Sequence, residues 1–210
     1  MRNNKIIPFK TKPETIKDFM KEMITNPARK IESVGTYTAR YTKIAVAIFV
    51  IWIAAEFMQF FLFHVLFASL SDFIMNPVIM QTIIMSSLAP AITIIATALG
   101  VYLFFRRDVG QPQFLLTTIV VANVPTALGA VLSLLPTLIG IFTPLGLTLS
   151  IIITSINGIL RLISMLLLYF GLKAFLEEND NERFFLGFIK IQIVYFVLGL
   201  LPLIFDFPGI

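Results

Sequence analysis

The run from Phe114 to Leu172 decides the fold, and it reads FLLTTIVVANVPTALGAVLSLLPTLIGIFTPLGLTLSIIITSINGILRLISMLLLYFGL. Its one formal charge is Arg161. A single membrane-spanning helix needs about 20 apolar residues, so this run is long enough for two. Prolines and glycines gather between Thr137 and Gly146. We therefore predict two spans joined by a turn there.

The composition of the whole chain points the same way. Of its 210 residues, 58% are hydrophobic and only 13% are charged, whereas soluble domains carry about 25% charged residues. We predict an all-α integral membrane protein, a polytopic helix bundle. The absence of cysteine excludes disulfide and thiolate chemistry. The polar first 43 residues and the long apolar run after them predict no cleavable signal peptide.

Five apolar stretches follow the N-terminal segment, and we predict that each is a span. Their approximate ranges are 44–70, 77–105, 114–136, 147–172 and 184–205. Ten of the sixteen Lys and Arg residues lie in positions 1–43, and more lie near 106–107 and 173–183. The positive-inside rule then predicts a cytoplasmic N-terminus and an outside C-terminus in the cell membrane. The predicted domains are a basic cytoplasmic segment, 1–43, and a transmembrane domain, 44–206.

An amphipathic helix is predicted from Glu14 to Thr25, because apolar residues recur there three and four positions apart. Asn26-Pro27 ends it, and a second helical segment is expected from Ala28 to Tyr41. We expect five cations of this region to contact anionic lipid or a protein partner: Lys17, Lys21, Arg29, Lys30 and Arg40. Docking on the membrane surface and packing on the protein's own loops both remain open.

Arg161 dominates the search for a site. A cation at mid-membrane costs roughly 3 kcal/mol on insertion scales, so we expect it to have a partner. At 1.5 Å per residue, Glu56 and Arg161 both lie roughly 18 Å from the cytoplasmic face. We predict that they approach each other. With Asn123 and Asn157 they form the predicted binding site, and both a structural ion pair and a ligand or proton site remain open.

Polar and small residues share one face of each later span. In the fourth span they are Ser150, Thr154, Asn157, Arg161 and Ser164. Such faces turn toward neighbouring helices in a bilayer, where hydrogen bonds are available. Packing within the bundle and a water-filled substrate path are the two interpretations.

Catalytic and metal-binding patterns are absent from the sequence. There is no His-Glu-x-x-His, no Gly-x-Ser-x-Gly and no phosphate-binding Gly-rich loop, and His64 is the single histidine. We expect a non-enzymatic protein with no cofactor and no metal. Membrane lipids are the expected partners, and nucleic acid is not. A protein partner at the cytoplasmic face and a homo-oligomer remain open.

Two short motifs and the overall plan resemble the Yip family, named after Ypt/Rab-interacting proteins. The motifs are Asn26-Pro27-Ala28-Arg29-Lys30 before the first span, and Ala122-Asn123-Val124-Pro125-Thr126-Ala127-Leu128-Gly129 continuing to Leu134-Leu135-Pro136. The plan is five closely spaced spans after a cytoplasmic N-terminus. The resemblance covers roughly residues 20 to 205.

This resemblance implies a five-span fold and a role without catalytic residues. Eukaryotic Yip proteins sit in ER and Golgi membranes, bind prenylated Rab GTPases and assist vesicle budding or membrane shaping. The chain lacks their long Gly/Pro-rich cytoplasmic arm and looks more like a prokaryotic member. The leading hypothesis is a scaffold or membrane organiser. The alternative is a small transporter or permease with a polar site around Arg161.

Overall fold

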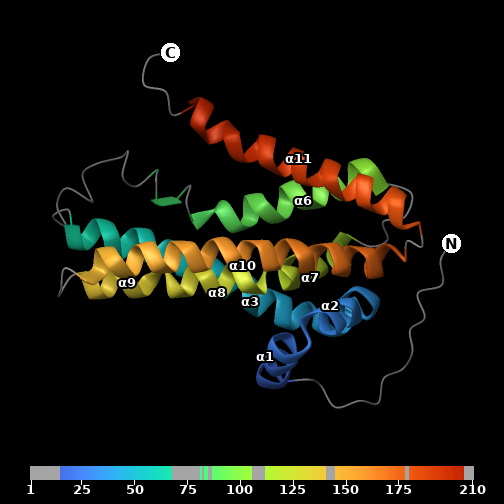
Figure 1. Ribbon diagram of the computed structural model, residues 1–210, viewed down its shortest axis with the longest axis horizontal. Coiled ribbons are helices and arrows are strands. Elements are labelled where there is room, and N and C mark those ends of the chain that lie inside the picture. Colours follow the sequence, from blue (N-terminus) through green and yellow to red (C-terminus); the bar gives the residue numbers. More distant parts are fainter. Residues whose placement is uncertain are drawn as a thin grey trace.

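A computed structural model describes residues 15–67, 81, 83–84, 87–105, 112–140, 145–177 and 180–205. Within these ranges the regular structure is entirely helical, and no strand occurs (Figure 1). The predicted all-α class is therefore confirmed for the part of the chain that is described. The helices are α1 (Ile16–Thr25), α2 (Pro27–Thr36), α3 (Thr38–Phe67), α6 (Ala89–Phe105), α7 (Pro112–Ala122), α8 (Val124–Leu132), α9 (Leu134–Gly140), α10 (Leu145–Leu176) and α11 (Asn181–Phe205).

Two of the described helices are long and apolar enough to cross a membrane. They contain the segments Thr38–Leu62 and Thr148–Leu176. A third span results if α7 and the helices after it are one broken span, bent by 48°. Helix α6 is apolar but has only 17 residues. The described residues thus contain two or three candidate spans by length and composition, as expected of a membrane protein, and the predicted loop at 70–77 lies outside the described residues.

The long helices lie side by side, with two packed groups visible in Figure 1. The line of α7, α8 and α9 packs against α3 on one side and α10 on the other. Helices α6 and α11 pack on each other, and α6 also contacts α3 and α7. The hairpin of α1 and α2, called the N-terminal hairpin below, lies at one end of this bundle.

Local sequence explains the N-terminal hairpin. The hydroxyl oxygen of Thr15 accepts a 3.2 Å hydrogen bond from the Asp18 backbone N–H, which caps α1. Helix α1 ends at Asn26, and Pro27 occupies the first turn of α2, where its missing N–H is no loss. The predicted end of the first helix is thus confirmed.

Helix α2 approaches α10 closely because two glycines face each other. A Cβ atom on Gly35 would lie 2.5 Å from the carbonyl oxygen of Gly171. A Cβ atom on Gly171 would in turn lie 2.9 Å from Ile31 and 3.1 Å from Thr118. Only the absence of side chains allows this contact. It fixes the N-terminal hairpin against α10 and α7.

The third predicted span is broken at Asn123, before Pro125, and again at Ser133. The backbone N–H of Thr126, freed at the start of α8, donates to Ser164 Oγ of α10 at 3.1 Å. Lipid offers no water to satisfy such groups, so a bent span needs partners of this kind.

Several predicted boundaries differ from the structure. The second helical segment does not run to Tyr41: α2 ends at Thr36, and α3 begins at Thr38 instead of Ile44. The fourth span continues past Leu172 to Leu176, so the predicted 173–183 loop is shorter. Propensity alone does not place these ends, because α2 and the last turns of α10 are stabilised by each other.

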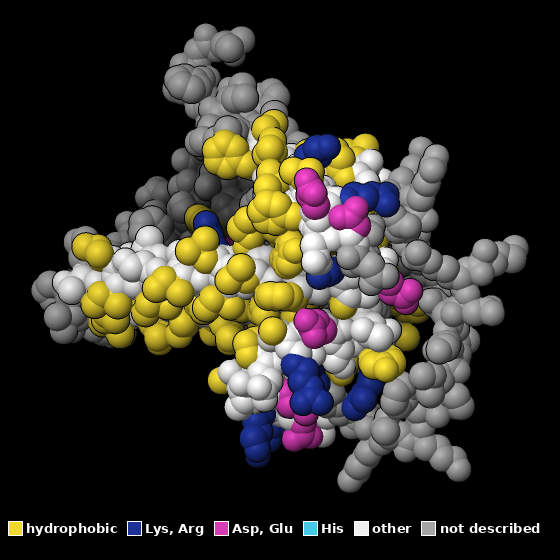
Figure 2. All heavy atoms as spheres, turned by 45° about the vertical axis from the view of Figure 1, so that its right-hand side comes forward, with side chains coloured by type: hydrophobic (Ala, Val, Ile, Leu, Met, Phe, Trp, Pro, Cys, Tyr) yellow, Lys and Arg dark blue, Asp and Glu magenta, His cyan; other side chains and the backbone are white. Residues whose placement is uncertain are grey.

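Charged side chains gather at one end of the molecule. Figure 2 shows Lys, Arg, Asp and Glu over the end that is turned forward, while the elongated body behind it is mostly hydrophobic. The N-terminal hairpin and the start of α11 belong to this charged end. An apolar body with one polar end is typical of a membrane domain with a water-facing surface.

Candidate functional site

Glu56 lies half-buried on α3. Its Oε1 accepts a 3.3 Å hydrogen bond from the indole N–H of Trp52, one turn earlier on the same helix. Arg161 lies within electrostatic range of Glu56, but no ion pair joins the two among the described residues. The predicted approach of Glu56 and Arg161 stays a prediction. Helices α7, α8 and α9 pack against both of the helices that carry these residues.

Arg161 occupies the middle of α10, as the sequence predicts, and its side chain is exposed. Its immediate helix neighbours Leu162 and Gly158 are exposed as well. A Cβ atom on Gly158 would meet nothing within 4 Å. This face of α10 therefore points away from the bundle, toward lipid or a partner.

The side-chain amides of Asn123 and Asn157 both form hydrogen bonds within the helix bundle. Asn123 is buried at the α7–α8 break, and its Nδ2 donates to the carbonyl oxygen of Ile119 at 2.9 Å. Asn157 on α10 donates from Nδ2 to Ser133 Oγ at 2.7 Å, whereas its buried Oδ1 accepts no hydrogen bond from the described residues. The Asn157 amide thus links α10 to the end of α8, and the Asn123 amide bonds a backbone carbonyl group near the end of α7.

The four residues of the predicted site do not share a hydrogen bond with one another. Glu56, Asn123 and Asn157 instead form hydrogen bonds with other residues. The partners are Trp52, Ile119 and Ser133, respectively. The face predicted for α10 splits in the same way: Asn157 and Ser164 pack on α8, whereas Ser150, Thr154 and Arg161 are exposed. Helix rotation separates these two sets, although they lie only three or four residues apart.

The cations of the N-terminal hairpin fall into two groups. Lys17, Lys21 and Arg29 are exposed, as a surface contact requires. Arg40 is exposed too, and its guanidinium lies 5.7 Å from the Tyr41 ring centroid. Lys30 differs, since its side chain is only 4% exposed. Its ammonium is engaged inside the protein, so the burial of Lys30 does not favour the expected contact with anionic lipid or a protein partner, which stays a prediction.

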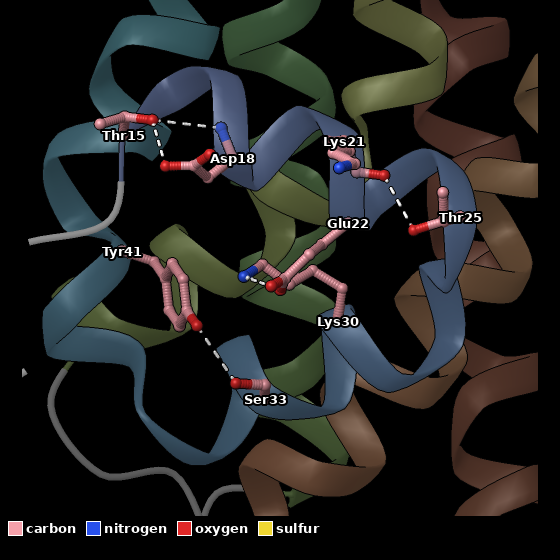
Figure 3. A network of polar contacts seen from close by, with 8 residues as sticks. All are labelled: Thr15, Asp18, Lys21, Glu22, Thr25, Lys30, Ser33 and Tyr41. Atoms are coloured by element: carbon pink, nitrogen blue, oxygen red, sulfur yellow. Dashed lines mark hydrogen bonds and ion pairs between the residues drawn. The ribbon is translucent and has the colours of Figure 1, made fainter.

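Lys30 is held in a cage between α1, α2 and α3. Its Nζ lies 2.7 Å from Glu22 Oε2, and 5.2 and 5.1 Å from the ring centroids of Phe19 and Tyr41. Figure 3 shows the Glu22 and Lys30 side chains pointing toward each other. Aromatic faces attract a desolvated cation. The hydrogen bond and the charge of Lys30 lower the pKa of the Glu22 carboxyl.

Helix α1 keeps an apolar surface outside this cage. Phe19 and Met23 are buried, whereas Ile16 is 53% and Ile24 is 73% exposed. The two isoleucines are eight residues apart and share one helix face, which borders Lys17 and Lys21. An exposed apolar stripe beside cations is the pattern of an interfacial membrane helix.

Sequence reasoning missed the cage and the Gly35–Gly171 contact. The spacing of Glu22 and Lys30 across a proline break was the available signal for the cage, whereas nothing local marks Gly35. No group of three or more His, Cys, Asp or Glu side chains able to hold a metal ion occurs among the described residues. No known family model, curated protein or solved structure matches the chain.

Proposed function

We propose that this protein is a non-enzymatic membrane organiser of the Yip type, with five spans, a cytoplasmic N-terminus and an outside C-terminus. The N-terminal hairpin is the binding element, and it holds lipid or a protein partner at the cytoplasmic face of the cell membrane. One observation carries the proposal. The hairpin is docked on α10 through Gly35 and Gly171, yet α1 still presents Ile16 and Ile24 outward.

Docking supports a scaffold because it fixes the height of α1 relative to the spans. A tethered but mobile helix could bind lipid anywhere within reach of its linker, whereas α1 is held by α2, and α2 by α10. Lys17 and Lys21 then sit beside the exposed isoleucines, where anionic headgroups attract cations. Each basic side chain near such a surface contributes about 1 kcal/mol.

The test uses the absence of native cysteine. Single variants Ile16→Cys and Ile24→Cys, labelled with an environment-sensitive fluorophore, are reconstituted in vesicles that contain anionic lipid. We expect lipid-borne quenchers to reduce emission at both positions, and to spare a label on the control Glu177→Cys, which is exposed just after α10. Equal, water-like emission at all three positions would exclude membrane contact by α1.

Single-cysteine variants also test orientation and span number. A membrane-impermeant maleimide added to intact cells or right-side-out vesicles should leave Arg29→Cys and Glu177→Cys unlabelled until the membrane is opened. Cysteines placed in the loops near 72 and 143 should react before opening. Labelling of position 29 or 177 from outside would refute the proposed topology.

A small transporter is the second candidate, and two observations favour it. Arg161 is exposed in the middle of a span, and the buried Asn157 Oδ1 has no partner among the described residues. Gly158→Cys discriminates, because a side chain there meets no neighbouring atom within 4 Å. Reaction with a water-soluble thiol reagent indicates a hydrated path, whereas absence of reaction indicates a lipid-facing surface and favours the scaffold.

A further inference from the structure

A cleft opens at the charged end, where α6 finishes and α11 begins. It has a volume of about 230 Å³ and is lined by Phe104, Phe105, Arg183, Leu186, Gly187 and Lys190. Among the described residues, the lining combines two cations with apolar groups and includes no carboxylate. None of these residues belongs to the N-terminal hairpin or to the mid-membrane polar set.

The floor of this cleft is rigid. The Phe105 ring packs against Gly187 so closely that a Cβ atom there would collide with it. Phe105 is 2% exposed, and its ring centroid lies 5.6 Å from that of Phe184. A second close approach, between Gly100 and Ile191, holds the same two helices together. The cleft is therefore part of the packed α6–α11 pair.

The two cations stand on one face of α11. Arg183 and Lys190 are seven residues apart, which is about two turns and about 10 Å along the helix. Both are exposed. Lys190 Nζ lies 5.9 Å from the Phe104 ring centroid, which places the ammonium over the aromatic wall of the cleft. Two long basic side chains at this spacing can close on one phosphate group between them.

An exposed apolar stripe continues from the cleft along α11. It consists of Leu186, Ile193 and Val197, which are 52%, 55% and 53% exposed and recur seven and four residues apart. Along the helix, Arg183, Leu186 and Lys190 lie nearest the charged end, and the exposed apolar residues Ile193 and Val197 follow them. A membrane phospholipid has the same order, phosphate first and acyl chain after it. A free phosphate ion has no acyl chain that could pack against this stripe.

We propose that the α6–α11 cleft binds an anionic membrane phospholipid, with its phosphate between Arg183 and Lys190 and an acyl chain along Leu186, Ile193 and Val197. Basic pockets between membrane helices on the cytoplasmic side bind anionic headgroups in this manner. This site holds an anionic lipid at α6 and α11. It is separate from the N-terminal hairpin and independent of what the hairpin binds.

The experiment compares lipid binding by the full chain. Purified protein in neutral detergent is mixed with phosphatidylglycerol or phosphatidylcholine, and bound lipid is counted by native mass spectrometry. We expect wild type to prefer phosphatidylglycerol, and the double variant Arg183→Gln/Lys190→Gln to lose about tenfold or more in affinity for it. The control Lys43→Gln removes an exposed cation of α3 that belongs to neither proposed lipid contact and should keep the preference.

Leu186→Glu provides a second variant at a side chain that is 52% exposed, so it disturbs the α6–α11 packing little. Its carboxylate repels the phosphate, so the preference should again disappear. The site is overturned if the Arg183/Lys190 variant and Leu186→Glu bind phosphatidylglycerol as wild type does, or if the Lys43→Gln control loses as much. Competition by inorganic phosphate at equal concentration would overturn the lipid as the ligand. None of these results bears on membrane contact by Ile16 and Ile24.

Discussion

Lys30 Nζ lies 2.7 Å from Glu22 Oε2, and this ion pair joins a buried side chain to an exposed one. The Lys30 side chain is 4% exposed and that of Glu22 is 61% exposed. The pair closes the N-terminal hairpin from its outer surface. It also lies where α1, α2 and α3 meet, since the rings of Phe19 and Tyr41 flank the ammonium.

Lys30→Ala should loosen α1 without detaching α2. The substitution removes the cation from between two rings and leaves a cavity, at a cost of roughly 2 kcal/mol. Lys30→Met keeps the side-chain volume and should cost less. Hydrogen exchange by mass spectrometry on the protein in nanodiscs should show faster exchange over residues 15–25. Unchanged exchange in Lys30→Ala would contradict the cage, and α10 serves as the internal control.

Acid should release the same contact. Lys30 lowers the pKa of the Glu22 carboxyl, first by its hydrogen bond and then by its charge, with Arg40 adding to the effect and Asp18 opposing it. The folded pKa is thus below the usual value of 4.5. The stabilisation is complete above that value and is lost as the pH falls through the folded pKa. A spin label on Thr25→Cys should gain mobility in this acid range.

The matched variant for the acid experiment is Glu22→Gln. It carries no titrating group at position 22, so the mobility of the label should change little over the same pH range. A wild-type label whose mobility stays constant through the acid range, or a Glu22→Gln protein that follows the wild-type curve, would count against the assignment to this pair.

Gly35→Ala should destabilise the protein, because the new methyl group would lie 2.5 Å from the backbone oxygen of Gly171. Overpacking of this kind costs about 1–3 kcal/mol. Gly158→Ala is the matched control, since its methyl group meets no neighbouring atom within 4 Å. It should be neutral or stabilise α10 by up to about 1 kcal/mol. Thermal unfolding in detergent measures both, and equal melting temperatures would disprove the close helix contact.

Ser164→Ala should weaken the contact between α8 and α10. Ser164 Oγ accepts the Thr126 backbone N–H at 3.1 Å and lies 2.8 Å from Thr126 Oγ1. Its loss leaves a buried donor unpaired, at about 1–2 kcal/mol. Ser155→Ala is the control, because the exposed Ser155 hydroxyl donates only to Ile151 of its own helix. The melting temperature should fall for position 164 alone.

Much of the fold could be predicted from local sequence. Helical periodicity predicted α1, and Asn26-Pro27 correctly marked its end. The apolar run predicted α10 with Arg161 in its middle. The break near Pro125 is also readable, since proline removes a helix hydrogen bond. The start of α3 at Thr38 was missed, because a single turn residue, Tyr37, separates two helices that have no sequence breaker between them.

The candidate site was less predictable than the helices. Depth along a helix follows from counting residues, so Glu56 and Arg161 were placed at similar heights. Whether they touch depends on how α3, α10 and the line of α7, α8 and α9 pack together, which counting residues does not give. The burial of Lys30 has the same origin: charge suggests a surface residue, but its place opposite Phe19 and Tyr41 depends on how α1 folds back on α2.

The sequence by itself determined that this chain forms membrane helices with a basic, amphipathic start, because hydrophobicity, helical period and proline act over a few neighbouring residues. Only the tertiary structure decided which cations are exposed at the surface and which are enclosed. Those outcomes depend on the rotation and order of packed helices, which are set by close contacts such as Gly35 with Gly171, between residues far apart in the chain.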